Sequence, residues 1–204
     1  AIMVIIGLYV RLRLAETPVF QAVVDAGEKA KTPLATAMRT AWRPMVLGTF
    51  IMLATYTLFY LMTAWASSYG TKKSTAEQVT NLGIAPTTFI KMQLIAVLFF
   101  AVCIPVSGLL ADRLGRKPVL IAVTVAIIIF GISFSLFIGP DVADQTRMLW
   151  FLIVGMTLMG LTFGPMSAVL PELFATNIRY TGSGISYNMA SILGAAVAPF
   201  IATA

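Results

Sequence analysis

The feature that most constrains this chain is a set of five long stretches without a charged residue. Asp, Glu, Lys and Arg are absent from residues 44–71, 92–111, 118–140, 148–171 and 180–204. A helix needs about 20 apolar residues to cross a hydrocarbon core about 30 Å thick, and each stretch reaches that length. Because 59% of the residues are hydrophobic, 11% are charged and the mean hydropathy is +0.91, an ordinary soluble domain is excluded. The sequence predicts an integral protein of the lipid bilayer with five spanning helices.

Both ends of the chain are apolar. Residues 1–10 form a stub that is too short to span a membrane and lacks the basic start of a signal peptide, so we expect the end of an earlier helix. Residues 198–204 are still apolar at the last position. We therefore expect the chain to be part of a longer membrane protein.

Basic residues are unevenly divided between the two sides of the predicted membrane. Ten of the 14 Lys and Arg residues lie before the first stretch, between the second and third, or after the fourth. The four on the opposite side are Lys72, Lys73, Lys91 and Arg147. Since short loops rich in Lys and Arg stay in the cytoplasm, the larger set predicts the cytoplasmic side.

The groups that most enzymes and metal sites need are missing from the sequence. The chain has no His, its single Cys103 lies within an apolar stretch, and every Asp and Glu lies outside the five stretches. The basic residues are dispersed among helix ends, without the aromatic platform of a nucleic-acid site. We expect no enzyme activity, cofactor, metal ion or nucleic-acid partner. The polar segment 11–43 suits a solvated linker or a surface-lying helix.

The most specific motif is the loop at residues 108–117, which reads GLLADRLGRK. A small residue at Gly108 allows close approach of another helix, Asp112 can cap or face a helix N-terminus, and Gly115 permits a tight turn. A cytoplasmic position alone would explain the basic residues. The complete order resembles the cytoplasmic signature of the major facilitator superfamily, which recurs after the second helix of each six-helix half.

This resemblance implies an all-α membrane protein with the major facilitator fold, of which the chain holds a partial C-terminal six-helix bundle. Residues 1–10 then end transmembrane helix 6, and residues 11–43 form the cytoplasmic central loop. Residues 44–204 form the bundle, with helices 7 to 11 at about 45–68, 90–111, 118–139, 148–170 and 181–204. Helix 12 and nearly all of the N-terminal half are expected to be missing.

Two further motifs narrow the resemblance. Residues 7–20, GLYVRLRLAETPVF, are similar to the end of helix 6 in the metabolite:proton symporter family. Residues 171–182, PELFATNIRYTG, are similar to the segment between helices 10 and 11 of that family. Its members import organic acids such as shikimate, ketoglutarate and citrate, or zwitterionic osmolytes such as proline and betaine. The resemblance implies proton-coupled uptake of a small polar metabolite across the inner (plasma) membrane.

Proton coupling usually requires an intramembrane carboxylate or His, and the five stretches contain neither. We therefore expect the proton carrier, a buried Asp or Glu, in the missing N-terminal half. The stretches contain no fixed cation either, so an anionic and a zwitterionic solute both stay open.

Charged residues of the loop motifs are expected at the cytoplasmic ends of neighbouring helices, where we hypothesise a gate. Its charges would pair in the outward-facing state and separate in the inward-facing state. The simpler interpretation is that they only fix the topology. The candidate gate and motif residues are Gly108, Asp112, Arg113, Gly115, Arg116, Glu172 and Arg179.

A polar stripe on the first stretch is the best candidate for solute contact. At 100° per residue, Thr49, Tyr56, Tyr60, Thr63 and Ser67 fall within roughly 60° of arc. Tyrosine hydroxyls can donate to a carboxylate, although Ser and Thr in membrane helices often bond their own backbone. The candidate solute-binding residues are Tyr56, Tyr60, Thr63, Gln93, Tyr187, Asn188 and Ser191.

A channel, or a non-transporting membrane scaffold or sensor on the same fold, is the alternative function. A channel favours a polar ring repeated around an oligomer axis, whereas this sequence has a single polar stripe beside helices interrupted by Pro105, Pro165 and Pro199. These prolines suit either bend points or tolerated kinks.

Overall fold

The computed structural model describes residues 2–13, 21, 25, 33–75, 78–138 and 144–203. Much of the predicted central loop, and Ala204 at the end of the last predicted span, lie outside the described residues. The elements are α1 (Ile2–Arg13), α3 (Pro33–Thr40), α4 (Trp42–Tyr60), the π-helix η1 (Leu61–Trp65), α5 (Ala66–Thr71), β1 (Lys73–Thr75), β2 (Gln78–Leu82), α6 (Pro86–Leu114), α7 (Arg116–Ile132), α8 (Phe134–Phe137), α9 (Gln145–Glu172) and α10 (Arg179–Thr203).

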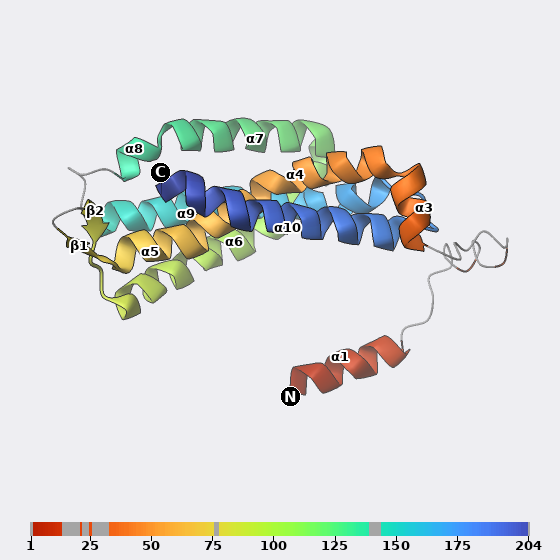
Figure 1. Cartoon of the computed structure of the whole chain (residues 1–204), viewed down its shortest axis with the longest axis horizontal. Coiled ribbons are helices and arrows are strands. Elements are labelled where there is room, and N and C mark those ends of the chain that lie inside the picture. Colours follow the sequence, from red (N-terminus) through yellow and green to blue (C-terminus); the bar gives the residue numbers. More distant parts are fainter. Residues whose placement is uncertain are drawn as a thin grey trace.

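The long helices run side by side as an elongated bundle (Figure 1). Contacts are most extensive between α6 and α9 and between α4 and α10, so the bundle is built from two closely packed helix pairs. α7 packs against α9, and α1 stands apart from the bundle in Figure 1. α3 and the β1–β2 hairpin lie at opposite ends of the bundle.

Three continuous helical segments are long and apolar enough to cross a membrane among the residues that the structure describes. They are Trp42–Thr71, Pro86–Leu114 and Gln145–Glu172, with 30, 29 and 28 residues. The other two predicted spans correspond to α7 with α8, of which α7 alone has 17 residues, and to α10.

The helices extend beyond the uncharged stretches because local signals outside those stretches set their ends. α6 begins with Pro86, whose fixed φ angle suits the first helical turn. α9 begins after Asp144, whose carboxylate accepts a hydrogen bond from the Thr146 N–H at 2.9 Å.

One span is interrupted where the sequence predicted a single helix. The expected helix over 118–139 divides at Ser133, where the backbone turns to φ −79° and ψ 4° between α7 and α8. The Ser133 hydroxyl donates to the Ile129 carbonyl at 2.8 Å, as serine hydroxyls do when they compete for helical acceptors. The predicted span over 118–139 is therefore described as two helical segments, α7 and α8, with a turn at Ser133 between them.

Glycines on α9 allow α6 to approach closely. A Cβ atom on Gly160 would come within 2.6 Å of the Phe100 carbonyl oxygen, and one on Gly164 within 2.5 Å of the Ile104 carbonyl oxygen. Ser107, fully buried between the helices, donates to the Gly160 carbonyl at 3.2 Å. Small residues thus bring the two backbones close at this part of the pair, and a hydroxyl bond joins them.

Gly108 takes part in that approach through its backbone, since a Cβ atom on Gly164 would lie 3.1 Å from the Gly108 nitrogen. A Cβ atom on Gly108 itself would meet no atom within 4 Å among the described residues, so the small size of Gly108 is not what lets α6 and α9 approach. The helix pair is close because of Gly160 and Gly164 on the partner helix, which lie against α6 between Phe100 and Gly108.

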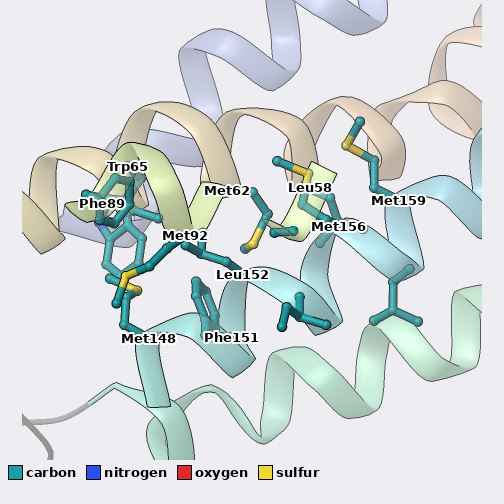
Figure 2. Close-up of a cluster of buried hydrophobic side chains, with 14 of the residues drawn as sticks. Leu58, Met62, Trp65, Phe89, Met92, Met148, Phe151, Leu152, Met156 and Met159 are labelled. Atoms are coloured by element: carbon teal, nitrogen blue, oxygen red, sulfur yellow. The ribbon is translucent and has the colours of Figure 1, made fainter. Parts of the chain in front are cut away.

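Sulfur and aromatic side chains fill the core between the helix pairs (Figure 2). Met62 of η1 and Met148 of α9 are fully buried, and Phe151 stacks on Phe130 with ring centroids 5.3 Å apart. Flexible methionine side chains fill irregular gaps, so this seam can adapt to small shifts of the helices.

A short hairpin joins α5 to α6, which the sequence did not predict. β1 and β2 pair antiparallel, with Lys73 opposite Leu82. Gly83 follows with a φ of 60°, a conformation that glycine adopts without strain, and its N–H bonds to the Lys72 carbonyl at 2.9 Å. The hairpin is therefore held against the end of α5.

The described C-terminal part of the predicted central loop is helical. α3 places Ala37, which is fully buried, against the bundle, and it packs on α10 and α4. α4 begins at Trp42, directly after a bend at Ala41. Of the two alternatives for this segment, residues 33–40 follow the helical one, and they form a short docked helix rather than a solvated linker.

Candidate functional site

Four of the predicted solute-binding residues meet across the α4–α10 interface. The rings of Tyr56 and Tyr187 pack edge to face, with centroids 5.1 Å apart and planes at 85°. One turn further along α4, the Tyr60 hydroxyl lies 3.3 Å from the Ser191 Oγ, within hydrogen-bond distance. We call these four residues the tyrosine wall.

The wall is compact because small residues of one helix face bulky groups of the other. A Cβ atom on Gly194 would come within 2.7 Å of the Tyr56 Cβ, and one on Gly48 within 3.1 Å of the Ser186 Oγ. The buried Ser186 hydroxyl donates to the Met45 carbonyl at 3.0 Å. α4 and α10 are thus fixed in register around the wall.

Two other predicted residues bond their own helices. The Thr63 hydroxyl donates to the Phe59 carbonyl at 2.6 Å. Asn188 is exposed rather than packed on another helix, and its amide donates to the Gly184 carbonyl at 2.7 Å. The i−4 bonds satisfy one donor of each side chain, and the Asn188 side-chain oxygen stays available on the exposed face beside Tyr187.

Gln93 contacts backbone rather than another polar side chain. Its amide nitrogen donates to the Met62 carbonyl at 3.2 Å and lies 3.5 Å from the Thr63 carbonyl. Both carbonyls belong to the π-helix η1, in which the Ala66 N–H bonds to the Leu61 carbonyl five residues earlier. The contact joins α6 to the wide turn that follows the tyrosine wall.

The same π turn breaks the stripe that the sequence predicted. Thr49 through Tyr60 lie on regular helix, but the wide turn separates them from Ser67 in α5. A stripe laid out at 100° per residue therefore loses its register after Tyr60. Sequence reasoning had no signal for this turn, because residues 61–65 read as ordinary apolar helix.

Sequence reasoning also missed two polar residues that couple the helix pairs. The Thr55 hydroxyl of α4 donates to the Thr162 hydroxyl of α9 at 3.1 Å, and both side chains are buried. The sequence signal that could have found this pair is that both threonines lie near the middle of a predicted membrane span. This bond joins the tyrosine-wall pair to the α6–α9 pair.

An apolar groove of about 440 Å³ lies between α4 and α7. Nine of its lining residues are apolar or Gly, and Thr57 is the exception. A polar solute finds few partners there, so the tyrosine wall is the better candidate site.

At one end of the bundle, the first residue of α7 forms an ion pair with the last residue of α9. The Arg116 guanidinium donates to the Glu172 carboxylate, and it is the one salt bridge among the described charged side chains. The hydrogen bond and charge of Glu172 raise the pKa of Arg116, which precedes the apolar part of α7, and the charge of Asp112 adds to this effect. Two of the predicted gate residues are thus in direct contact, with a third close by.

The other gate candidates lie around this pair without joining it. Arg179 donates from Nε to the Phe174 carbonyl at 3.3 Å, which fastens the turn between α9 and α10. Asp112 and Arg113 are exposed, and α7 starts without a side-chain cap, so the capping expected of Asp112 is not seen. Gly115 adopts a φ of 91°, which confirms the predicted tight turn before α7.

Long uncharged helices, hydroxyl bonds between them and charges at the helix ends define a multi-pass α-helical membrane protein. The chain belongs to the Major Facilitator Superfamily, whose family model matches residues 1–199. This membership confirms the predicted fold class, to which the structure adds the small hairpin. It also confirms that the chain is not an enzyme.

Several curated proteins are similar to nearly the whole chain. The Inner membrane metabolite transport protein YhjE of Escherichia coli (strain K12) is 49% identical over 99% of this chain and 45% of its own length. A Putative metabolite transport protein of Haemophilus influenzae is 44% identical over 98% of this chain and 46% of its own. The Proline/betaine transporter of Escherichia coli is 27% identical over 97% and 39%. The chain spans about half the length of these relatives, and no solved structure matches it significantly.

Proposed function

We propose that the full-length protein is a secondary-active transporter of the inner membrane that imports a small polar metabolite together with protons. The superfamily membership and the transport proteins among the relatives support this proposal. The observation that carries it is the tyrosine wall, which gathers hydroxyl groups and aromatic rings from the uncharged stretches of α4 and α10.

In this mechanism, the wall forms one side of a solute site between two halves of the protein. Tyr56 and Tyr187 offer ring faces for the body of the solute, and their hydroxyls offer hydrogen bonds to a carboxylate. Asn188, exposed beside the wall, adds an amide oxygen and an amide N–H. The N-terminal half supplies the opposite side and the proton-carrying carboxylate, since the uncharged stretches of this chain contain no acid.

At the cytoplasmic end, Arg116 and Glu172 act as part of a gate with Asp112, Arg113 and Arg179. In the outward-facing state the charges hold the ends of α7 and α9 together, and in the inward-facing state they separate. The contact between helix ends from different parts of the bundle supports this role.

The test is uptake by the full-length protein in proteoliposomes. Radiolabelled shikimate, succinate and betaine are each offered with and without an imposed pH gradient. Accumulation of one of them above equilibrium, abolished when the gradient is collapsed, is the expected result. Passive flux that ignores the gradient would favour a channel, and solute binding without any flux would favour a sensor.

A further inference from the structure

Gln93 occupies an unusual position for a polar side chain in a membrane helix. It projects from α6 toward the π-helix η1, where its amide donates to the Met62 carbonyl and lies near the Thr63 carbonyl. A side-chain amide without a partner is costly in an apolar helix bundle. Here the partner is the backbone of a neighbouring helix.

The π turn explains why these carbonyls can accept. A wide turn replaces i→i+4 hydrogen bonds with i→i+5 bonds, as between Ala66 and Leu61, and weakens the regular pattern around it. A side chain from outside the helix can insert at such a turn and donate to its carbonyls. Gln93 supplies that donor.

The turn is also held from its other side. Met62 is fully buried, and it packs so tightly on α9 that a Cβ atom on Gly155 would come within 3.0 Å of its side-chain carbons. The turn between Leu61 and Trp65 is therefore held by α6 through a hydrogen bond and by α9 through packing.

The position of the tyrosine wall depends on this turn. Tyr60 is the residue immediately before η1, and its hydroxyl lies next to Ser191 of α10. If the turn relaxed to regular α-helix, its extra residue would become part of the helix. The segments before and after the turn would then rotate relative to each other by about 100°, the angle that one residue spans. Tyr60 or the segment after it would then leave its present place.

We propose that Gln93 is a positioning residue for transport: by holding the π-helix η1, it keeps Tyr60 in the tyrosine wall without itself touching the solute. This inference rests on the proposed function of the wall. The sequence predicted Gln93 as a solute ligand, whereas here it supports the solute ligand Tyr60.

The experiment compares Gln93→Met, which keeps the size and loses the donor, with the matched control Gln145→Met at the exposed first residue of α9. Both are made in the full-length protein. Backbone amide exchange of residues 61–66 reports on the turn, and uptake of radiolabelled shikimate, succinate and betaine gives KM and Vmax per folded molecule. We expect Gln93→Met to accelerate exchange and to raise KM about 2- to 12-fold, as loss of one hydrogen bond allows, with Vmax nearly unchanged. Gln145→Met should change neither.

A second variant removes the turn itself. Deleting Ala64, an exposed residue of η1, should convert the segment toward regular helix, and Gln93→Met should then have no further effect on KM. Full additivity of the two changes would overturn the proposal. So would unchanged exchange in Gln93→Met, or abolished uptake with normal exchange, since the latter indicates direct solute contact. If the wild-type protein takes up none of the three solutes, the proposed function fails for them, while the exchange comparison still decides whether Gln93 holds the turn.

Discussion

Arg116 and Glu172 form an ion pair that joins the first residue of α7 to the last residue of α9, although 55 residues separate them in the chain. The side chains are 37% and 59% exposed, so water screens their attraction. An exposed pair adds little to stability, but a pair that forms in only one conformation can bias the equilibrium between two conformations.

If Arg116 and Glu172 act in the proposed gate, Glu172→Gln should shift the full-length protein toward the inward-facing state, because it weakens the contact between the ends of α7 and α9. The measurement is the distance between spin labels on the cytoplasmic ends of the two halves of the full-length protein. Exchanging the charges, with Arg116→Glu and Glu172→Arg combined, should restore the original distribution. An unchanged distribution and uptake rate in both Glu172→Gln and Asp112→Asn would leave these charges with a role in topology alone.

Tyr60→Phe should weaken solute binding by removing the hydroxyl that meets Ser191. A lost hydrogen bond of this kind is worth about 0.5–1.5 kcal/mol, which corresponds to a rise in KM of about 2- to 12-fold. The control is Tyr180→Phe, since Tyr180 is 91% exposed and lies outside the wall. Uptake kinetics of the full-length protein decide the prediction, and equal KM values for the two variants would contradict it.

Gly164→Ala should destabilise the α6–α9 pair, because the new methyl group would lie within 2.5 Å of the Ile104 carbonyl oxygen. Forcing an extra group into a packed helix interface costs about 1–3 kcal/mol. Gly108→Ala on the facing helix is the matched control, since its methyl group meets nothing within 4 Å among the described residues and alanine favours helix by about 1 kcal/mol. Thermal unfolding in detergent should show a lowered midpoint for Gly164→Ala only.

Thr55→Val and Thr162→Val should be strongly coupled. The Thr55 hydroxyl donates to Thr162, so either single change removes their bond, and Thr162→Val also leaves a buried donor to be satisfied elsewhere. We expect a coupling free energy of about 1 kcal/mol between the two positions, measured from the unfolding of the single and double variants. Additive effects would show that the bond does not couple the helix pairs.

The sequence was most informative about features that depend on charge and local conformation. Uncharged stretches predicted the long helices, because a buried charge in a bilayer is costly. Gly115 predicted its turn, because a φ of 91° strongly favours glycine. These features depend on the chemistry of one segment at a time.

Features that depend on a partner helix were harder to predict. The sequence pointed to the small size of Gly108, whereas the glycines whose missing side chains permit the approach of α6 and α9 are Gly160 and Gly164, and only the opposite helix distinguishes them. It placed Gln93 among solute ligands, whereas its amide bonds to the Met62 carbonyl. Helices that are apolar on nearly every face carry little periodicity to show which face meets a neighbour.

The π-helix η1 affects how residue roles can be transferred between this chain and its relatives. A π bulge holds one residue more than the regular helix that it replaces, so a relative without it would require a single-residue gap within a membrane span. Alignments rarely open such gaps inside hydrophobic segments. Residues that face the solute site should therefore be matched between relatives separately for the part of the helix before Leu61 and the part after Trp65.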